Sequence, residues 1–176
     1  TTETHERSTL TNRWRGGRTI VLISVVGVLL TGCSFFNSSR DIDPCSLVTD
    51  SELSAYGDYG EPERRDRGNQ RICTWYNSTT QPLRTTVTPQ LNIYVNHKQR
   101  YYTAGQNDVE TGYAAGRRYK VRTTDSTCTV TMPVFKNTVG SKKKKGTVDI
   151  AVTMPDPKDN CPTARKIAEI VSPRLH

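Results

Sequence analysis

The two segments Thr147-Val-Asp-Ile-Ala-Val-Thr-Met154 and Pro162-Thr-Ala-Arg-Lys-Ile-Ala-Glu-Ile-Val171 decide the fold. In the first, every second residue is a large apolar one, which is the pattern of a β-strand with one buried face. In the second, the apolar positions recur at helical spacing: Ala164, Ile167, Ala168 and Val171. Pro162 suits the first turn of a helix, and Ser172-Pro173 stops it. The chain is therefore predicted to end with a strand and a helix that packs on a sheet.

Upstream of this pair, the same alternation predicts further strands. They are expected over residues 71–76, 91–95, 119–121 and 128–134. Pro133 favours an edge position for the strand that contains it, because proline has no N–H to donate to a sheet. We interpret residues 60–69 as a charged loop and residues 112–116 as a turn that leads into a strand.

A first helix is predicted near the start of the folded part. Thr49-Asp-Ser-Glu52 is a capping box, and Val48 and Leu53 are placed to pack together as a hydrophobic staple. Gly57 can end this helix. The predicted fold class is therefore α+β: an antiparallel sheet of about five strands, with an N-terminal and a C-terminal helix packed on it and two disulfides. We expect a single extracytoplasmic domain over residues 43–176.

The first 33 residues predict export. Residues 13–18 are basic, residues 19–30 carry no charge, and Leu30-Thr-Gly-Cys33 follows directly. This order is typical of a secretory signal peptide. The tetrad resembles the bacterial lipobox, whose cysteine is acylated with chains such as palmitate and becomes the first residue. We expect residues 1–32 to be the signal peptide and residues 33–42 a lipidated tether. A plain cleaved signal and an uncleaved anchor helix are the alternatives.

With Cys33 assigned to lipid, four cysteines remain: Cys45, Cys73, Cys128 and Cys161. An even number in an exported chain predicts two disulfides. Three pairings are open, and we favour the sequential one, Cys45 with Cys73 and Cys128 with Cys161. Each bond would close a loop of about thirty residues and stabilise the fold by about 3–4 kcal/mol. No two cysteines have the close spacing of a zinc site and no histidine pair accompanies them, so we expect no metal and no cofactor.

The composition indicates one ordinary domain with a thin core. Of 176 residues 34% are hydrophobic, and 25 Lys+Arg outnumber 17 Asp+Glu, for a formal net charge of +8. Four lysines are consecutive: Lys142, Lys143, Lys144 and Lys145. We interpret this run as a solvated hairpin connection. The alternative is contact with anionic lipid or an acidic wall polymer, at about 1 kcal/mol per lysine near a charged membrane. Nucleic acid is not an expected partner of an exported, tethered domain.

Residues able to carry out chemistry are scarce. Only His97 could serve a folded site, and it lies in a polar run at a strand end, so we interpret it as a solvated surface residue. No G-x-S-x-G motif accompanies it, and the cysteines are assigned to lipid or disulfides. Trp75 shares a strand face with Cys73 and is predicted to pack over its disulfide. The candidates for an exposed aromatic surface are Tyr56, Tyr59, Tyr101 and Tyr102.

Several motifs follow one another in a familiar order: Asp43-Pro-Cys-Ser-Leu-Val-Thr49, Cys73-Thr-Trp75, Gly112-Tyr-Ala-Ala115, Cys128-Thr-Val130 and Cys161-Pro-Thr-Ala-Arg-Lys-Ile-Ala168. This order resembles an actinobacterial lipoprotein family that is catalogued as a domain of unknown function. The resemblance covers nearly all of residues 43–175. It implies an envelope location and a disulfide pattern, and no reaction. The chain departs from the family pattern in residues 79–90 and in the lysine run.

Two classes of function are therefore considered. The first is a non-catalytic binding or adaptor module, lipid-anchored on the outer face of the plasma membrane, which engages an envelope protein, a small ligand or an anionic wall polymer. The second is an envelope hydrolase with a site around His97. We favour the first, because the sequence offers no convergent set of histidine, thiol and metal ligands. The chain is thus predicted not to be an enzyme.

Overall fold

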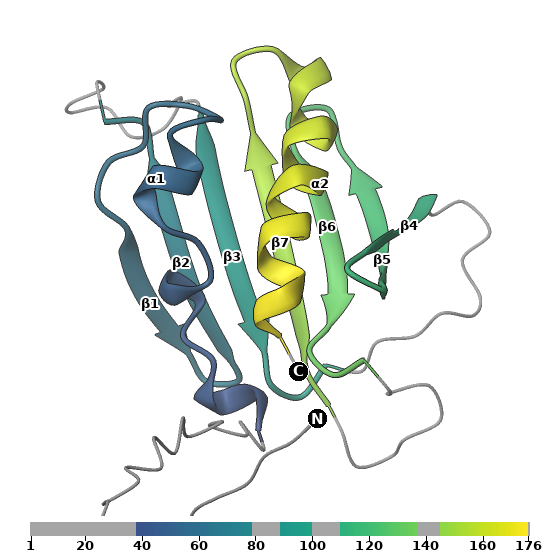
Figure 1. Ribbon diagram of the computed structural model, residues 1–176. Helices are drawn as coiled ribbons and strands as arrows, with labels where there is room; N and C mark the ends of the chain where they lie inside the picture. The colour runs from purple at the N-terminus through teal and green to yellow at the C-terminus, as the bar shows by residue number, and fades with distance from the viewer. Residues whose placement is uncertain (1–37, 79–88, 100–109, 137–144, 176) are drawn as a thin grey trace, which may run out of the picture. The chain divides into compact units, whose positions relative to one another are not determined.

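The computed structural model describes residues 38–78, 89–99, 110–136 and 145–175 (Figure 1). Its strands are β1 (Glu63–Arg67), β2 (Gln70–Tyr76), β3 (Gln90–Asn96), β4 (Glu110–Ala114), β5 (Arg117–Thr123), β6 (Cys128–Pro133) and β7 (Thr147–Thr153). Its α-helices are α1 (Asp50–Leu53) and α2 (Asn160–Val171). Short 3-10 turns lie at η1 (Ser39–Asp41), η2 (Pro44–Ser46), η3 (Pro157–Asp159) and η4 (Ser172–Arg174).

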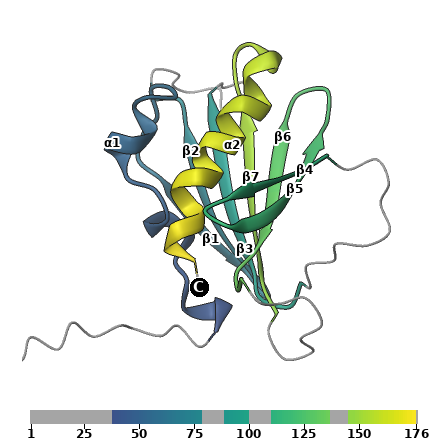
Figure 2. The same cartoon turned by 45° about the vertical axis from the view of Figure 1, so that its right-hand side comes forward.

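The strands form one antiparallel sheet in the order β1-β2-β3-β7-β6-β5-β4. The strand whose alternation is cleanest in the sequence, β7, is also the middle strand. Its apolar residues Val148, Ile150 and Val152 are fully buried. The long helix α2 crosses one face of the sheet over β6 and β7, as Figures 1 and 2 show from two sides. The α+β class is confirmed, but the sheet has seven strands rather than about five.

The first additional strand, β1, lies where we predicted a charged loop. All five of its residues are charged, so it carries no apolar alternation. It forms because its backbone pairs with β2 from Glu63 opposite Thr74 to Arg67 opposite Gln70. Gly68, with a φ of +56°, supplies the left-handed turn between the two strands.

The second additional strand, β4, lies where we predicted a turn. Gly112 belongs to the strand and sits opposite Tyr119 of β5. A Cβ atom at Gly112 would lie 2.4 Å from the Tyr119 ring, so the glycine makes room for that side chain. The turn itself is shorter than expected: Ala115 and Gly116 both have positive φ, 47° and 75°, as a two-residue hairpin turn requires.

The strand that contains Pro133 is not at an edge, because β6 lies between β5 and β7. Pro133 is tolerated because it is the last residue of β6, beyond Thr131, where the pairing with β5 stops. The N–H of Val134, the next residue, donates to the carbonyl of Gly146, which directly precedes β7. Neighbouring residues of a strand direct their backbone groups to opposite sides. Val134 points its N–H toward the β7 side, so Pro133 points toward the β5 side. The pairing with β5 has already ended there, and the sheet loses no hydrogen bond.

The N-terminal helix is a single turn rather than a helix that packs along the sheet. Its capping box is confirmed: the Thr49 side chain accepts from the Glu52 N–H, and the Glu52 carboxylate accepts from the Thr49 N–H at 2.9 Å. Val48 and Leu53 are both buried. The chain leaves the helix after Leu53, and Arg174 reaches back from the C-terminal end to pair with Glu52.

The core lies between α2, the N-terminal segment and one face of the sheet, and both predicted disulfides border it. Cys45 is joined to Cys73, and Cys128 to Cys161. The first bond attaches η2 to β2, and the second attaches the start of α2 to β6. Trp75 is only 1% exposed and belongs to the same buried cluster as Cys73.

A buried arginine ties the end of α2 to the sheet. The guanidinium group of Arg117 donates to the carbonyls of Pro133 at 2.8 Å and Val134 at 2.9 Å, and to the Ser172 hydroxyl at 3.3 Å. Ser172 in turn donates to the carbonyl of Ala114. Burial lowers the pKa of Arg117 to about 10, so the group remains a cation at neutral pH. A cation is favourable here because the carbonyl end of a helix is partly negative.

Candidate functional site

The face of the sheet opposite α2 is lined with polar side chains. Strand alternation sends Val148 and Ile150 toward α2, and their neighbours to the other side. We call this second side the polar sheet face. One row of directly paired residues crosses it from edge to edge: Arg65, Ile72, Tyr94, Asp149, Thr131, Lys120 and Thr111. We call it the Asp149 row.

Hydrogen bonds between side chains fix the groups around Asp149. Asn96 Nδ2 donates to Asp149 Oδ2 at 2.9 Å and to Thr147 Oγ1 at 3.3 Å. Asn96 Oδ1 accepts from Gln70 Nε2 at 2.7 Å. These amides and hydroxyls are therefore held in fixed orientations on a rigid sheet.

The carboxyl group of Asp149 is the central feature of the polar sheet face. Its Oδ1 atom is buried and has no hydrogen-bond partner among the described residues. Burial raises the pKa of Asp149, although hydrogen bonds from Thr131 and Asn96 and the charge of Arg122 oppose this shift. A buried acceptor without a partner costs about 1–3 kcal/mol. Oδ1 is therefore an acceptor with unused capacity at the centre of an otherwise bonded network.

Tyr94, which pairs directly with Asp149, adds a donor to the same place. Its pKa is raised, first by burial and then by the nearby charge of Asp149. The phenol therefore stays protonated at neutral pH and can donate a hydrogen bond. Tyr94 and Asp149 thus contribute a donor and an acceptor from paired positions of β3 and β7.

Exposed cations flank this central part on two sides. Arg65 and Arg67 lie on β1, and Arg118 and Arg122 lie on β5. Arg65 pairs with Glu63 at 3.0 Å. Neighbouring strands are about 4.8 Å apart, so β1 and β5 are separated by roughly 24 Å. The polar sheet face therefore has hydrogen-bonding groups at its centre and positive charge toward its margins.

His97, the histidine of the hydrolase hypothesis, is not fully solvated as we predicted. It is partly buried at the end of β3, and its Nδ1 atom is buried without a hydrogen-bond partner in the described part of the chain. Burial lowers the pKa of His97, and a hydrogen bond with the backbone of Ser39 opposes the shift. The hydroxyl of Ser39 donates to the carbonyl of Lys145 at 3.2 Å. Its hydroxyl is therefore engaged elsewhere, and the geometry does not favour a Ser-His pair.

Several predicted site residues lie outside the described residues: Cys33, Lys142, Lys143 and Lys144. Lys145 is described and exposed, two residues before the start of β7. The structure therefore places one member of the lysine run, at the end of the sheet where β7 begins.

The aromatic candidates differ from the prediction. Tyr56 and Tyr59 are partly buried against the core, and burial raises the pKa of Tyr59 to about 12. Tyr101 and Tyr102 lie outside the described residues. Among the described residues, the large aromatic side chain that stands out in solvent is Tyr113 of β4, at 70% exposure. Sequence reasoning missed it because β4 was interpreted as a turn.

The described residues contain neither a membrane-spanning helix nor a cluster of metal-binding side chains. None of their helices is long and apolar enough to cross a membrane. No group of three or more metal-binding side chains of the histidine, cysteine, aspartate and glutamate type comes together among them.

The polar sheet face was also missed by sequence reasoning, although a signal for it was present. Only the apolar members of the β7 alternation entered the prediction, and the polar ones were assigned no role. Asp149 is the one charged residue within the segment Thr147-Val-Asp-Ile-Ala-Val-Thr153, and Tyr94 and Asn96 follow the same alternation in β3. Aspartate is rare in β-strands, so its presence in this segment is a signal that the side chain has a role on its face of the sheet.

Comparison with known proteins identifies the family but no characterised relative. No curated protein and no solved structure matches the chain. A family model described as a protein of unknown function (DUF3558) matches residues 35–174. This match spans the sheet, α2 and both disulfides, and the chain therefore belongs to the DUF3558 family.

Proposed function

We propose that this protein is a lipid-anchored envelope lipoprotein whose folded domain is a non-catalytic binding module. Its ligand is a segment of an anionic, hydroxyl-bearing wall polymer that lies on the polar sheet face. The observation that carries this proposal is the unpartnered Oδ1 of Asp149 at the centre of a hydrogen-bonded polar network.

The chemistry of the centre favours a ligand with hydroxyl groups. Asp149 Oδ1 is an acceptor without a donor among the described residues, and the Tyr94 phenol is a donor that a ligand can accept from. A hydroxyl group both donates and accepts, so it satisfies both residues at once. Amide and hydroxyl side chains around them, held by Asn96 and Gln70, extend the same type of surface.

The exposed arginines at the margins of the polar sheet face favour a ligand that is also anionic and extended. The cations Arg65 and Arg67 on one side and Arg118 and Arg122 on the other are separated by the width of the intervening strands. A small anion would reach one side, whereas a polymer with repeated negative charges reaches both. Arginine is well suited to phosphate and carboxylate groups, because its planar fork donates two parallel hydrogen bonds.

The envelope location rests on the sequence. The basic and apolar segments before Leu30-Thr-Gly-Cys33 have the order of a lipoprotein signal. Two disulfides support it, because such bonds persist in oxidising compartments outside the cytosol. An acyl anchor at Cys33 would hold the binding module near the wall polymers that it meets.

The test is a binding titration of Ser34–His176 followed by NMR, with glycerol phosphate oligomers as the anionic probe and neutral dextran oligosaccharides as the comparison. The glycerol phosphate oligomers should shift the amide signals of the Asp149 row. Asp149→Asn should weaken their binding at least about tenfold, since a hydrogen bond to a charged group contributes about 1.5–3 kcal/mol. The matched control is Asp125→Asn, an exposed carboxylate in the β5–β6 connection.

Shifts confined to other parts of the domain would contradict the proposal, as would equal affinities of wild type and Asp149→Asn. Tighter binding of dextran than of the anionic oligomers would show that the flanking arginines do not select the ligand. The control variant should bind like the wild type in each case.

A further inference from the structure

One end of the sheet gathers the N-terminal segment and several strand ends. We call it the basal end, and it comprises η1, the β1–β2 turn, the ends of β3 and β6 and the start of β7. Hydrogen bonds connect these parts: His97 N–H donates to the Asn69 carbonyl, Gly146 N–H to the Gln99 carbonyl, and Val134 N–H to the Gly146 carbonyl. In Figure 1 η1 lies at this end, below the strands.

The N-terminal segment is locked onto the basal end rather than hanging free. Ser39 is 2% exposed, and its hydroxyl donates to the carbonyl of Lys145. The guanidinium group of Arg71 donates to the carbonyls of Arg40 at 3.2 Å and Ile42 at 3.0 Å. The folded part therefore extends back to Ser38, upstream of the start that we predicted at Asp43.

Chain length then limits how far the basal end can be from an anchor. Only residues 34–37 separate Cys33 from Ser38. Five Cα–Cα steps span at most about 18 Å when fully extended. A lipid on Cys33 would therefore hold the basal end, and not the opposite end, close to the membrane surface.

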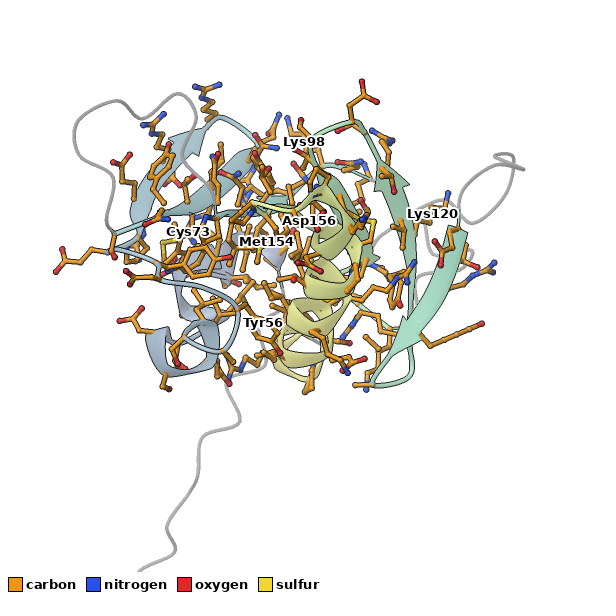
Figure 3. All side chains as sticks on the ribbon, turned by 90° about the horizontal axis from the view of Figure 1, so that it is seen from above. Tyr56, Cys73, Lys98, Lys120, Met154 and Asp156 are labelled. Carbon is orange, nitrogen blue, oxygen red and sulfur yellow. A yellow bond between two sulfur atoms is a disulfide. The ribbon has the colours of Figure 1, made fainter. Side chains whose placement is uncertain are left out.

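Exposed charges differ in sign between the two ends of the domain. Basic residues at the basal end are Arg40, Arg67, Lys98, Lys136 and Lys145, with Asp41 and Asp66 beside them. The opposite end, which we call the apical end, consists of the connections around residues 58–61, 124–127 and 154–160. It carries exposed acids at Asp58, Glu61, Asp125, Asp156 and Asp159, with Lys158 among them. Figure 3 looks onto the apical end and labels Met154 and Asp156 there.

We propose that the basal end is a membrane-contact surface that binds anionic lipid headgroups and orients the domain with its acidic end outward. The inference rests on the proposed anchor at Cys33 for its geometry. The charge distribution supports it independently, because an anionic leaflet attracts the basal end and repels the apical end. The polar sheet face then stands beside the membrane rather than against it.

The experiment uses the soluble unit Ser34–His176, which contains both disulfides and the buried core. Its co-sedimentation is measured with vesicles of phosphatidylcholine alone and with vesicles that also contain phosphatidylglycerol. The basal variant combines Arg40→Gln, Lys98→Gln, Lys136→Gln and Lys145→Gln. The control variant loses the same charge elsewhere, through Arg64→Gln, Lys158→Gln, Arg165→Gln and Lys166→Gln. Thermal unfolding confirms that both variants are folded.

The wild type and the control variant should bind only the vesicles with phosphatidylglycerol, and less as salt rises from 0.05 M to 0.5 M. The basal variant should lose binding by roughly fivefold for each cation that contacts the surface. Equal binding by the basal variant and the wild type would overturn the proposal, and so would wild-type binding that ignores phosphatidylglycerol. If glycerol phosphate oligomers bind at the basal cations while vesicles do not, the surface recognises a polymer and the lipid assignment is wrong. Since the soluble unit has no anchor, these outcomes are independent of acylation at Cys33.

Discussion

Asp149 is the residue on which the proposed binding site depends, and its buried carboxylate reduces the stability of the domain. It stands in the middle strand, directly opposite Tyr94 and Thr131, with one carboxylate oxygen bonded and the other buried without a partner in the described part of the chain. Folding alone would favour a neutral residue here, because burial of a charge without full hydrogen bonding costs free energy. The proposed binding role would explain why a carboxylate occupies the position.

The stability cost of Asp149 predicts a pH-dependent effect of Asp149→Asn. The raised pKa means that the folded state holds the proton more tightly than the unfolded chain, whose value is near 3.8. The wild type therefore loses stability relative to the variant as pH rises from about 3.8 through the folded-state pKa. Urea unfolding at pH 3.5 and pH 7 should show an advantage of the variant that is larger at pH 7. An advantage that is equal at both pH values, or a less stable variant at pH 7, would contradict this interpretation.

At the scale of elements, the sequence predicts those that bury apolar side chains. The interior strands β2, β3, β5, β6 and β7 and the helix α2 each bury an apolar set, and all six were predicted. The strands β1 and β4 were not, because one is wholly charged and the other contains the glycine that accommodates Tyr119. Both lie at the edges of the sheet and exist through backbone pairing with a neighbour. Backbone pairing leaves little trace in side-chain patterns.

The docking of the N-terminal segment was not predictable for a related reason. It depends on Gly146, whose φ is +140° and whose missing Cβ leaves room for Ser39. A Cβ atom there would lie 2.6 Å from Ser39 Cβ. The close approach of two segments more than one hundred residues apart has no local signature in the sequence.

Substitution of Gly146 tests this docking. Gly146→Ala should release η1 and destabilise the domain by about 1–3 kcal/mol, through backbone strain and the clash with Ser39. Hydrogen exchange at Asp41, whose N–H is bonded to the Ser38 carbonyl, should become faster. Gly68→Ala is the matched control, since Gly68 also has positive φ but nothing lies within 4 Å of its Cβ position. Unchanged protection of Asp41 in Gly146→Ala would show that the segment is held by other contacts.

For the whole molecule, the arrangement of charges and of the polar sheet face suggests one orientation in the envelope. In the proposed orientation, the cations of the basal end would face the membrane, the polar sheet face would stand beside it, and the acidic apical end would point away. Composition alone indicated a basic protein. It could not show that positive and negative charge are separated along the strands, because that separation arises only when strand ends distant in sequence meet. The candidate site was hidden in the same way, since the residues of the Asp149 row come from seven different segments.

The central claim, that the domain is held at the envelope by acylation, is tested most directly by metabolic labelling of the full chain with an alkyne-bearing fatty acid in a bacterial host. The labelled protein is read by gel fluorescence in membrane and soluble fractions, for the wild type and for Cys33→Ala. The account predicts that the wild type is labelled and remains with the membrane, and that Cys33→Ala carries no label and is left unprocessed or released. Equal labelling and equal membrane retention of the two proteins would contradict it.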